Sequence, residues 1–272
     1  MPKTEKETFF ENLKTFAAGL ADHVVCDEEW TMRGFIDIFK NVYPLTTDSK
    51  VLSKILELHL LPELFLFAER FAYVVEPAEK QNWYPDLTFI SRENHDIKFA
   101  VDLKTTYRDE KKADFCNGFT LGSHGEYFTN RDSTKNIQYP YSHYSGHFCI
   151  GIIYSRNVIQ PYASKIYSVD EISVIPAVIK KLIFFAAEKW RIASDKSGSG
   201  NTANIGSIKR IENILSGNGV FARAGEDIFN DYWVNFGRIS VRGTNGKYKK
   251  LSSLSEYLRY RGLPESLLNR EQ

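Results

Sequence analysis

The chain has 272 residues, of which 43% are hydrophobic, 14% aromatic and 25% charged. This composition is typical of a globular protein and excludes a disordered, collagen-like or low-complexity chain. The 35 Lys and Arg residues nearly balance the 34 Asp and Glu residues, and the net charge of +1 argues weakly against a nucleic-acid binder.

The length fits one large domain with an ample core. No apolar run is long enough to span a membrane, and the N-terminal MPKTEKETFFENLKTF lacks the apolar core of a signal peptide. The three cysteines are far apart and form no CxxC pair, which predicts a reducing cytoplasm. Charge is uneven along the chain, because residues 238–272 carry a net charge of +5 and the rest carry −4. A solvated basic tail has the same pattern, so the uneven charge alone does not indicate a function.

The first part of the chain is predicted to combine helices with a short excursion of strands. Apolar side chains at helical spacing indicate an amphipathic helix over residues 5–20. Residues 31–46 are typical of short strands and turns. Asp48 is a suitable N-cap for a helix through residues 51–58, and Pro62 is expected to begin a second helical segment.

The rest of the chain is predicted to form strands followed by short helices. Apolar or alternating runs bounded by polar turns predict strands at residues 72–76, 87–90, 97–103 and 148–154. We expect residues 178–191 to be helical and residues 194–207, which lack an apolar pattern, to be a loop. Two short helices are expected near residues 225–236 and 252–260. Together these elements predict an α+β (α/β) fold, a mixed sheet flanked by helices.

The most informative stretch is NWYPDLTFISRENHDIKFAVDLKTTY, residues 82–107. Asp102 and Lys104 lie two residues apart at the end of an apolar strand, so the pleat directs both side chains to one face. Asp86 begins the preceding strand, and a hairpin from Leu87 to Phe99 would place the two strands side by side. Two carboxylates and an ammonium group would then share one small volume.

This set of groups is typical of a metal site that acts on phosphates. Two carboxylates so close together repel each other unless a divalent cation lies between them. Mg²⁺ takes oxygen ligands, keeps several waters and can hold a phosphate oxygen as well. The lysine could stabilise charge that develops on a phosphate, or orient a metal-held water.

The alternative is that Asp-x-Lys marks an exposed strand face and Pro-Asp opens a turn. The flanking FAVDL is too apolar for a solvent-facing edge strand, which favours a site. Glu57 adds a further acid in the helix KVLSKILELHLL, where a carboxylate among leucines needs a partner. Otherwise Glu57 belongs to the polar face of an amphipathic helix.

Several longer segments carry more information than this short signature. They are VYPLTTDSKVLSKILEL (42–58), QNWYPDLTF (81–89), AVDLKTTY (100–107), FTLG (119–122), STKNIQYP (133–140) and GSGNTANIGSI (198–208). In these segments the chain resembles the EcoRV family of restriction endonucleases, one of the families of PD-(D/E)xK nucleases. The resemblance extends from about residue 40 to residue 262. The resemblance implies a PD-(D/E)xK core with a small dimerisation subdomain. It also implies that Glu57, Asp86, Asp102 and Lys104 are the catalytic residues, and that the three acids bind Mg²⁺, for which Mn²⁺ could substitute.

Residues 198–204 (GSGNTAN), here called the recognition loop, are interpreted as reading DNA bases. The GxG spacing only superficially suggests a phosphate cradle, because no strand leads into it and the GxGxxG spacing is absent. A flexible linker is another interpretation, but Asn and Thr side chains suit base edges in a major groove, and Gly lets the backbone approach a base. The resemblance supports this choice.

The resemblance assigns DNA contacts to specific residues of the chain. The expected major-groove contacts are Gly198, Ser199, Gly200, Asn201, Thr202, Ala203 and Asn204, and the second, minor-groove loop is represented by Gln81 and Asn82. Residues expected near the DNA backbone, where they position the duplex without reading it, are Thr105, Thr106, Tyr107 and Lys135.

The resemblance further implies a homodimer that cuts double-stranded DNA at GATATC and leaves blunt ends with 5′-phosphates. Within a single domain, residues 31–46 and about 155–180 would form the dimerisation subdomain, 47–154 the catalytic core, and 181–272 the part for DNA recognition with the C-terminal helices. A cognate DNA methyltransferase in the same bacterial cytoplasm is implied as well, with no membrane partner. Ala203 and Trp83 depart from the family's threonine and histidine, and two extra residues fall in 122–132. These departures concern base recognition, not the four chemical positions.

Two other functions are alternatives to sequence-specific cleavage. A repair or recombination nuclease of the same superfamily would keep Asp86, Asp102 and Lys104 but would not need the recognition loop. A DNA-binding module that has lost cleavage is not favoured, because all four chemical positions hold the expected residue types. His143 and His147 have helix-like spacing but no HExxH acid, so packing or surface positions are expected for them rather than a zinc site.

Overall fold

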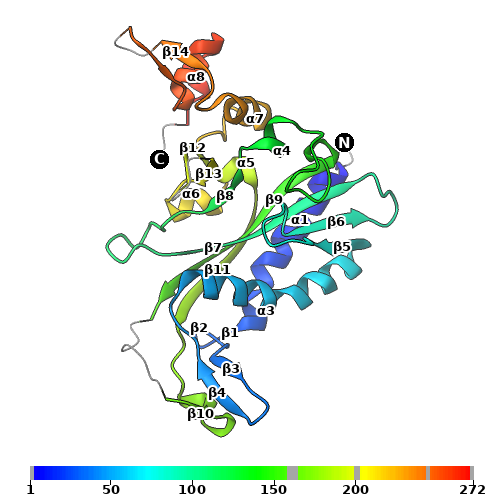
Figure 1. Ribbon diagram of the computed structural model, residues 1–272, viewed down its shortest axis with the longest axis vertical. Helices are drawn as coiled ribbons and strands as arrows, with labels where there is room; N and C mark the ends of the chain where they lie inside the picture. Colours follow the sequence, from blue (N-terminus) through cyan, green and yellow to red (C-terminus); the bar gives the residue numbers. More distant parts are fainter. Residues whose placement is uncertain (1–2, 158–164, 199–202, 243–245, 270–272) are drawn as a thin grey trace.

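A mixed β-sheet forms the centre of the molecule, as the computed structural model in Figure 1 shows for residues 3–157, 165–198, 203–242 and 246–269. Within these ranges the sheet has seven strands, in the order β1-β2-β11-β9-β7-β6-β5. Their bounds in that order are Val25–Cys26, Glu29–Trp30, Ile179–Glu188, Tyr144–Arg156, Lys98–Tyr107, Leu87–Ser91 and Tyr73–Pro77. β7 and β9 run parallel, whereas the other neighbours are antiparallel. The predicted α+β fold with a mixed sheet is confirmed.

Two long helices cover one face of this sheet. α1 (Glu5–Gly19) begins with a capping box at Thr4, and α3 (Ser49–Arg70) begins at Asp48, whose carboxylate accepts from the first backbone N–H groups. Phe9 of α1 stacks on Phe99 of β7 with ring centroids 4.2 Å apart, inside a buried apolar cluster that α3 also joins. Burial of the apolar faces of both helices fixes them on the sheet. The short α2 (Ala21–Val24) follows α1.

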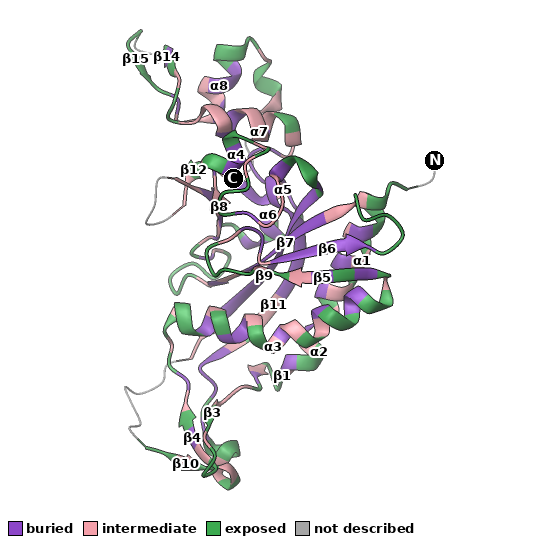
Figure 2. Ribbon diagram, turned by 45° about the vertical axis from the view of Figure 1, so that its right-hand side comes forward, coloured by how far each residue is buried: buried purple, intermediate pink, exposed green. Residues whose placement is uncertain are grey.

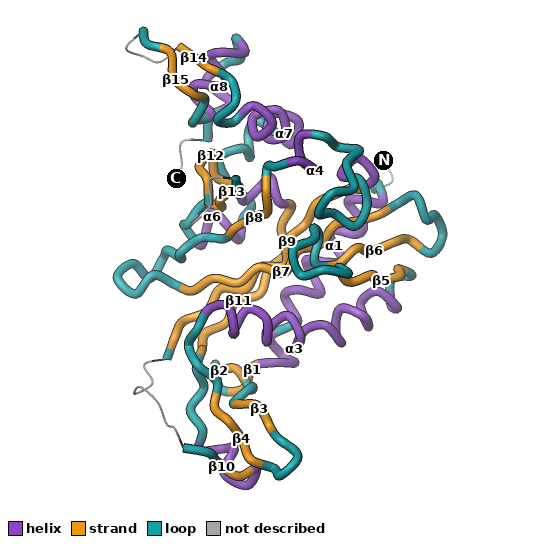
Figure 3. Tube along the Cα trace, viewed as in Figure 1, coloured by secondary structure: helices purple, strands orange, loops and turns teal. Residues whose placement is uncertain are grey.

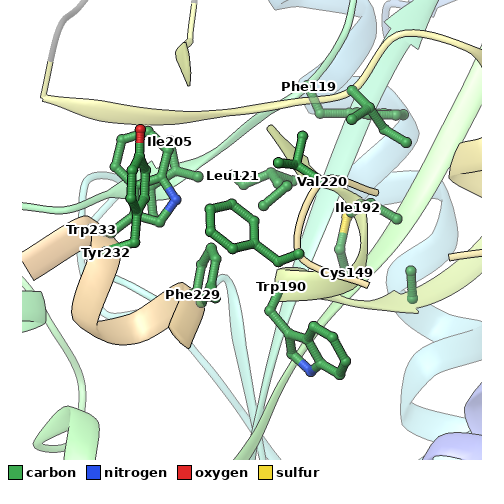
Figure 4. Close-up of a cluster of buried hydrophobic side chains, with 14 of the residues drawn as sticks. Phe119, Leu121, Cys149, Trp190, Ile192, Ile205, Val220, Phe229, Tyr232 and Trp233 are labelled. Carbon is green, nitrogen blue, oxygen red and sulfur yellow. The ribbon is translucent and has the colours of Figure 1, made fainter. Parts of the chain in front are cut away.

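The other face of the sheet packs against the C-terminal half of the chain. Figure 4 shows this second core, in which Trp233, Tyr232 and Phe229 lie against Leu121 and Ile205. The elements that surround it are β8 (Thr120–Ser123), α4 (Glu126–Thr129), α5 (Lys189–Ile192), β12 (Ala193–Ser197), β13 (Asn204–Ser207), α6 (Ile211–Leu215), α7 (Glu226–Asn235), β14 (Ser240–Arg242), β15 (Tyr248–Lys250) and α8 (Leu254–Arg261). Single 3₁₀ turns occur at Tyr141–His143, Val169–Val174 and Glu265–Leu267. The two helices expected near residues 225–236 and 252–260 are therefore confirmed.

A small separate sheet lies at the end of the molecule opposite α8 (Figure 3). Its order is β10-β4-β3, with β3 at Gly34–Ile36, β4 at Asn41–Pro44 and β10 at Tyr167–Ser168. We call it the outlying sheet. It joins parts of residues 31–46 and 155–180, the two segments that sequence analysis assigned to one subdomain.

One element was predicted wrongly. Residues 178–191 were expected to be helical, but β11 is a strand in the middle of the sheet, and α5 begins only at Lys189. The run LIFFAA is apolar at every position because a central strand is covered on both faces, and such a run also fits helical spacing. β9 and β2 flank β11 through contacts that are remote in sequence.

Other boundaries also differ from the prediction. Pro62 does not begin a new segment but lies inside the continuous helix α3. Pro62 has no backbone N–H, so the carbonyl of Leu58 loses its hydrogen bond within the helix. Leu58 lies on the exposed side of α3, so water can bond this carbonyl instead. The predicted loop 194–207 begins and ends as strands β12 and β13. In the described ranges no helix is long and apolar enough to cross a membrane.

A candidate active site of two aspartates and a lysine

Two neighbouring strands bring Asp86 and Asp102 together. Asp86 directly precedes β6, and Leu87 pairs with Val101 of β7, so the predicted hairpin is confirmed. The backbone N–H of Asp86 donates to Oδ1 of Asp102 over 3.1 Å. In return, Oδ2 of Asp86 accepts from the backbone N–H of Leu103 over 2.8 Å. Each carboxylate is thus oriented by the backbone of the other strand.

Lys104 lies between these carboxylates, on the same face of β7 as Asp102. Its Nζ is 3.2 Å from Oδ2 of Asp86 and 3.3 Å from Oδ2 of Asp102. The predicted convergence of the two aspartates and the lysine is therefore present. It follows from strand alternation together with the register of one hairpin.

Burial makes this small cluster electrostatically strong. Asp102 is only 5% exposed, and burial raises its pKa, an effect that Lys104 opposes and Asp86 reinforces. Burial by itself would lower the pKa of Lys104, but the two carboxylates outweigh it and raise that pKa above its ordinary value. Lys104 therefore stays an ammonium group at neutral pH and shares its charge between both aspartates.

Glu57, on α3, lines a cleft together with Asp86 and Lys104 but does not join this cluster. Its Oε1 is 2.6 Å from Nζ of Lys54, one turn earlier on α3. Across the described ranges, no three His, Cys, Asp or Glu side chains lie close enough together to hold a metal ion. The carboxylate of Glu57, which was expected to need a partner in an apolar helix, is paired with Lys54.

The donor chemistry of the site nevertheless fits a divalent cation held by Asp86 and Asp102. Both are hard oxygen donors, both line one pocket, and the backbone N–H groups already orient them. Lys104 pairs with both carboxylates, which would be the ligands of a bound cation. Glu57 could add a third oxygen only after leaving Lys54.

A cleft of about 910 Å³ runs over this site between α3 and the end of β7. Gln81, Thr105, Thr106 and Tyr107, all expected to lie near DNA, line it. Thr106 is nevertheless a buried side chain. A smaller adjoining pocket of about 310 Å³ is lined by other predicted residues, namely Asn82, Lys135 and Asn204, together with Asp86, Asp102 and Lys104.

The recognition loop is only partly visible. Ser199, Gly200, Asn201 and Thr202 lie outside the described residues. The loop ends are held, since the backbone N–H of Gly198 donates to Asn204 over 2.8 Å and that of His124 donates to Ala203 over 2.9 Å. The loop therefore starts and finishes on the sheet formed by β12, β13 and β8, beside the pocket that Asn204 lines.

Three groups of residues near the site were not predicted from the sequence. Lys50, Ser53 and Lys54 line the cleft from α3, and their i, i+3, i+4 spacing before Glu57 could have indicated this polar face. Gly122 lines both the cleft and the adjoining pocket. Lys189 lies behind the site and was missed because its segment, residues 178–191, was expected to be a helix.

His147 is a packing residue, as sequence analysis expected. It is buried, stacks on Tyr141 with centroids 3.9 Å apart, and its Nδ1 lies 2.8 Å from the hydroxyl of Tyr84. Burial lowers the pKa of His147 well below its ordinary value, which keeps the ring neutral. His143 is exposed, so the two histidines do not share a site.

Two comparisons with known proteins relate the chain to restriction endonucleases. The family model of restriction endonuclease EcoRV matches residues 26–262. The chain is also 38% identical over 237 residues to the type II restriction enzyme EcoRV of Escherichia coli, an alignment that covers 87% of this chain and 94% of that enzyme.

Proposed function

The chain belongs to the EcoRV family of restriction endonucleases, and from this premise we propose that it is a Mg²⁺-dependent enzyme that cuts double-stranded DNA at GATATC. The family assignment makes it a site-specific deoxyribonuclease of type II. The proposal adds the metal, the target, and blunt ends that carry 5′-phosphates. The observation that carries it is the convergence of Asp86, Asp102 and Lys104 in the pocket beside the cleft.

Asp86 and Asp102 would hold the Mg²⁺, with Mn²⁺ as a substitute, because both carboxylates point to the volume that Lys104 now bridges. Glu57 would act as an auxiliary ligand from α3. When bound, Mg²⁺ neutralises charge on the scissile phosphate and makes a water more acidic.

The residues of the chain then position and stabilise the reacting groups. Lys104 remains an ammonium group, so it can stabilise the negative charge that develops on the phosphate oxygens in the transition state. Water attacks phosphorus in line with the 3′-oxygen, the P–O3′ bond breaks, and the products are a 5′-phosphate and a 3′-hydroxyl. Thr105 and Tyr107 line the cleft next to Lys104, where they would position the DNA backbone.

Base recognition is assigned to the two polar segments beside this site. Asn204 and Asn82 line the pocket next to Asp102, which supports a recognition role for residues 198–204 and for Gln81 and Asn82. A host that carries such an activity needs a cognate DNA methyltransferase to protect its own sites, and both proteins would act in the bacterial cytoplasm.

A homodimer is proposed because the outlying sheet exposes an unusual number of apolar side chains. Ile38 is 90% and Phe39 is 78% exposed. Others that are exposed in or beside this sheet are Phe35, Ile36, Tyr43, Ile166, Ile172 and Val174. Contiguous apolar surface of this kind marks protein–protein interfaces. A two-fold dimer would match the symmetry of GATATC, with one active site for each strand.

The proposal is tested by single-turnover cleavage of short duplexes. One duplex contains GATATC, and the others carry a single exchanged base pair in its inner or outer positions. We expect Mg²⁺-dependent cutting of the GATATC duplex by the wild-type protein and none by Asp102→Asn, which keeps the size of the side chain and removes its charge. Equal cutting of all duplexes would refute sequence readout and favour the repair-type nuclease instead.

A further inference from the structure

Lys189 is a buried lysine whose ammonium group has no hydrogen-bond partner among the described residues. It begins α5 directly after β11 and is only 3% exposed. Its Nζ makes no hydrogen bond within the described part of the chain, and it lies 4.8 Å from the ring centroid of Tyr84 and 5.8 Å from that of Phe128. Contact with aromatic faces compensates only part of the cost of burying such a charge.

The sheet register places this ammonium group behind the candidate active site. Asp102 of β7 pairs with Cys149 of β9, and Cys149 pairs with Ala187 of β11. Those three side chains share one face of the sheet, and Lys189 follows Ala187 by two residues. Tyr84, whose ring the ammonium group faces, lies two residues before Asp86.

The backbone of Gly122 separates Lys189 from the cleft. A Cβ atom on Gly122 would lie 3.2 Å from Nζ of Lys189, and φ of this glycine is +97°. Gly122 also lines both the cleft and the adjoining pocket. The ammonium group therefore lies directly beneath the cleft floor, where the positive φ favours glycine and a Cβ atom would crowd the lysine.

The charge of Lys189 acts on the two-aspartate site. Its attraction lowers the pKa of Asp102 and opposes the effect of burial on that carboxyl group. Burial lowers the pKa of Lys189 itself to about 8, while Asp102 holds it up. Lys189 is therefore mostly protonated at pH 7, and its charge adds to that of Lys104 in the DNA-free protein.

We propose that the positive charge of Lys189 weakens metal binding at Asp86 and Asp102 in the DNA-free nuclease. Together with Lys104 it balances the charge of Asp86 and Asp102, so the site attracts a divalent cation strongly only when a DNA phosphate adds its own negative charge. This inference depends on the metal site of the proposed function. A lysine that only filled space would be replaced by methionine at no cost to the site, and with a gain in stability.

The test is the affinity of the DNA-free protein for Mn²⁺ alone, measured by isothermal titration calorimetry at pH 7. Lys189→Met keeps the shape of the side chain and removes the charge. We expect it to bind Mn²⁺ roughly tenfold more tightly than the wild-type protein, because a positive charge close to the cation is lost. Lys165→Met is the control. It removes an exposed lysine near the outlying sheet, far from the two aspartates, so Mn²⁺ affinity should stay unchanged.

The direction of the change separates electrostatics from damage to the fold. A disrupted site would bind Mn²⁺ more weakly and melt at a lower temperature, whereas we expect Lys189→Met to melt at the same or a higher temperature. Lys189→Gln serves as a second neutral variant and should also tighten Mn²⁺ binding. Unchanged or weaker Mn²⁺ binding by both folded variants would overturn the role of Lys189.

The same titration distinguishes this failure from failure of the metal site. If the wild-type protein binds Mn²⁺, Asp102→Asn abolishes binding, and Lys189→Met leaves it unchanged, only the inference about Lys189 is wrong. If neither the wild-type protein nor Lys189→Met binds Mn²⁺, the proposed metal site is wrong, and the inference is overturned with it.

Discussion

The two-aspartate site and the outlying sheet depart in opposite ways from the usual distribution of side chains. At the site, charged groups lie inside the molecule, since Asp102 and Lys189 are both buried. In the turn between β3 and β4 of the outlying sheet, Ile38 and Phe39 are exposed, and Figure 2 shows exposed residues at this end of the molecule, in contrast to the buried central strands. Buried charge is costly unless it serves chemistry, and exposed apolar surface is costly unless another surface covers it. The contrast therefore separates the place of catalysis from the place of assembly.

The largest expected effect comes from removing the charges of the site. Lys104→Met should lower the single-turnover cleavage rate by roughly 10²–10³-fold, because stabilisation of the transition-state charge is lost, while DNA binding persists. Asp102→Asn should cost at least as much. Lys98→Met, at the other end of β7, is the control and should cut at the wild-type rate. A Lys104→Met protein that is as active as wild type would refute the assignment of this site.

The next effect concerns the outlying sheet. Ile38→Glu should weaken dimerisation roughly thirtyfold or more, because a charge would enter the centre of the proposed interface. Sedimentation equilibrium measures this, and the monomeric fraction should lose double-strand cutting without losing its fold. Leu66→Glu replaces another exposed apolar residue, on α3 and away from the outlying sheet, and should leave the dimer intact. A wild-type protein that stays monomeric at all concentrations would contradict the role of the outlying sheet in dimerisation.

Glu57 lies between these extremes, since it lines the cleft but is paired with Lys54. We expect Glu57→Gln to reduce the cleavage rate less than Lys104→Met, by under roughly 10²-fold. Lys54→Met frees the carboxylate without changing it, and should lower the Mg²⁺ concentration needed for half-maximal rate. A Glu57→Gln protein as inactive as Asp102→Asn would instead place Glu57 among the indispensable ligands.

The smallest effect is a pH dependence of stability. The pKa of Lys189 is about 8 in the folded protein, below its ordinary value of 10.5. Between these values the unfolded chain binds more protons than the folded one, so this residue makes the free energy of unfolding rise as pH increases. Denaturation at pH 7, 8 and 9 should show a steeper rise for wild type than for Lys189→Met. Parallel profiles would show that Lys189 does not titrate differently on folding.

Features that depend on contacts between residues close in sequence could be predicted, whereas features that depend on contacts between distant parts of the chain could not. Asp86, Asp102 and Lys104 were predictable because alternation along one strand and a single hairpin bring them together. β11 was not, because only its pairing with β9 and β2 distinguishes its apolar run from a helix. Lys189 was missed for the same reason, since its position behind Asp102 exists only through the register of three strands.

The ends of the recognition loop show the same limit. Its polar composition indicated a loop, but Asn204 is in a strand because it pairs with Ser123 of β8, a contact between distant parts of the chain. The pairing of Glu57 with Lys54, by contrast, is local and could have been inferred from helical spacing.

Sequencing of the fragment ends from a plasmid of known sequence tests the central claim most directly. The purified protein is incubated with the plasmid with and without Mg²⁺, alongside Asp102→Asn. We expect blunt ends at the centre of GATATC, only with Mg²⁺ and only from the wild-type protein. An intact plasmid at every Mg²⁺ concentration, together with tight sequence-specific binding, would contradict a nuclease built on Asp86, Asp102 and Lys104.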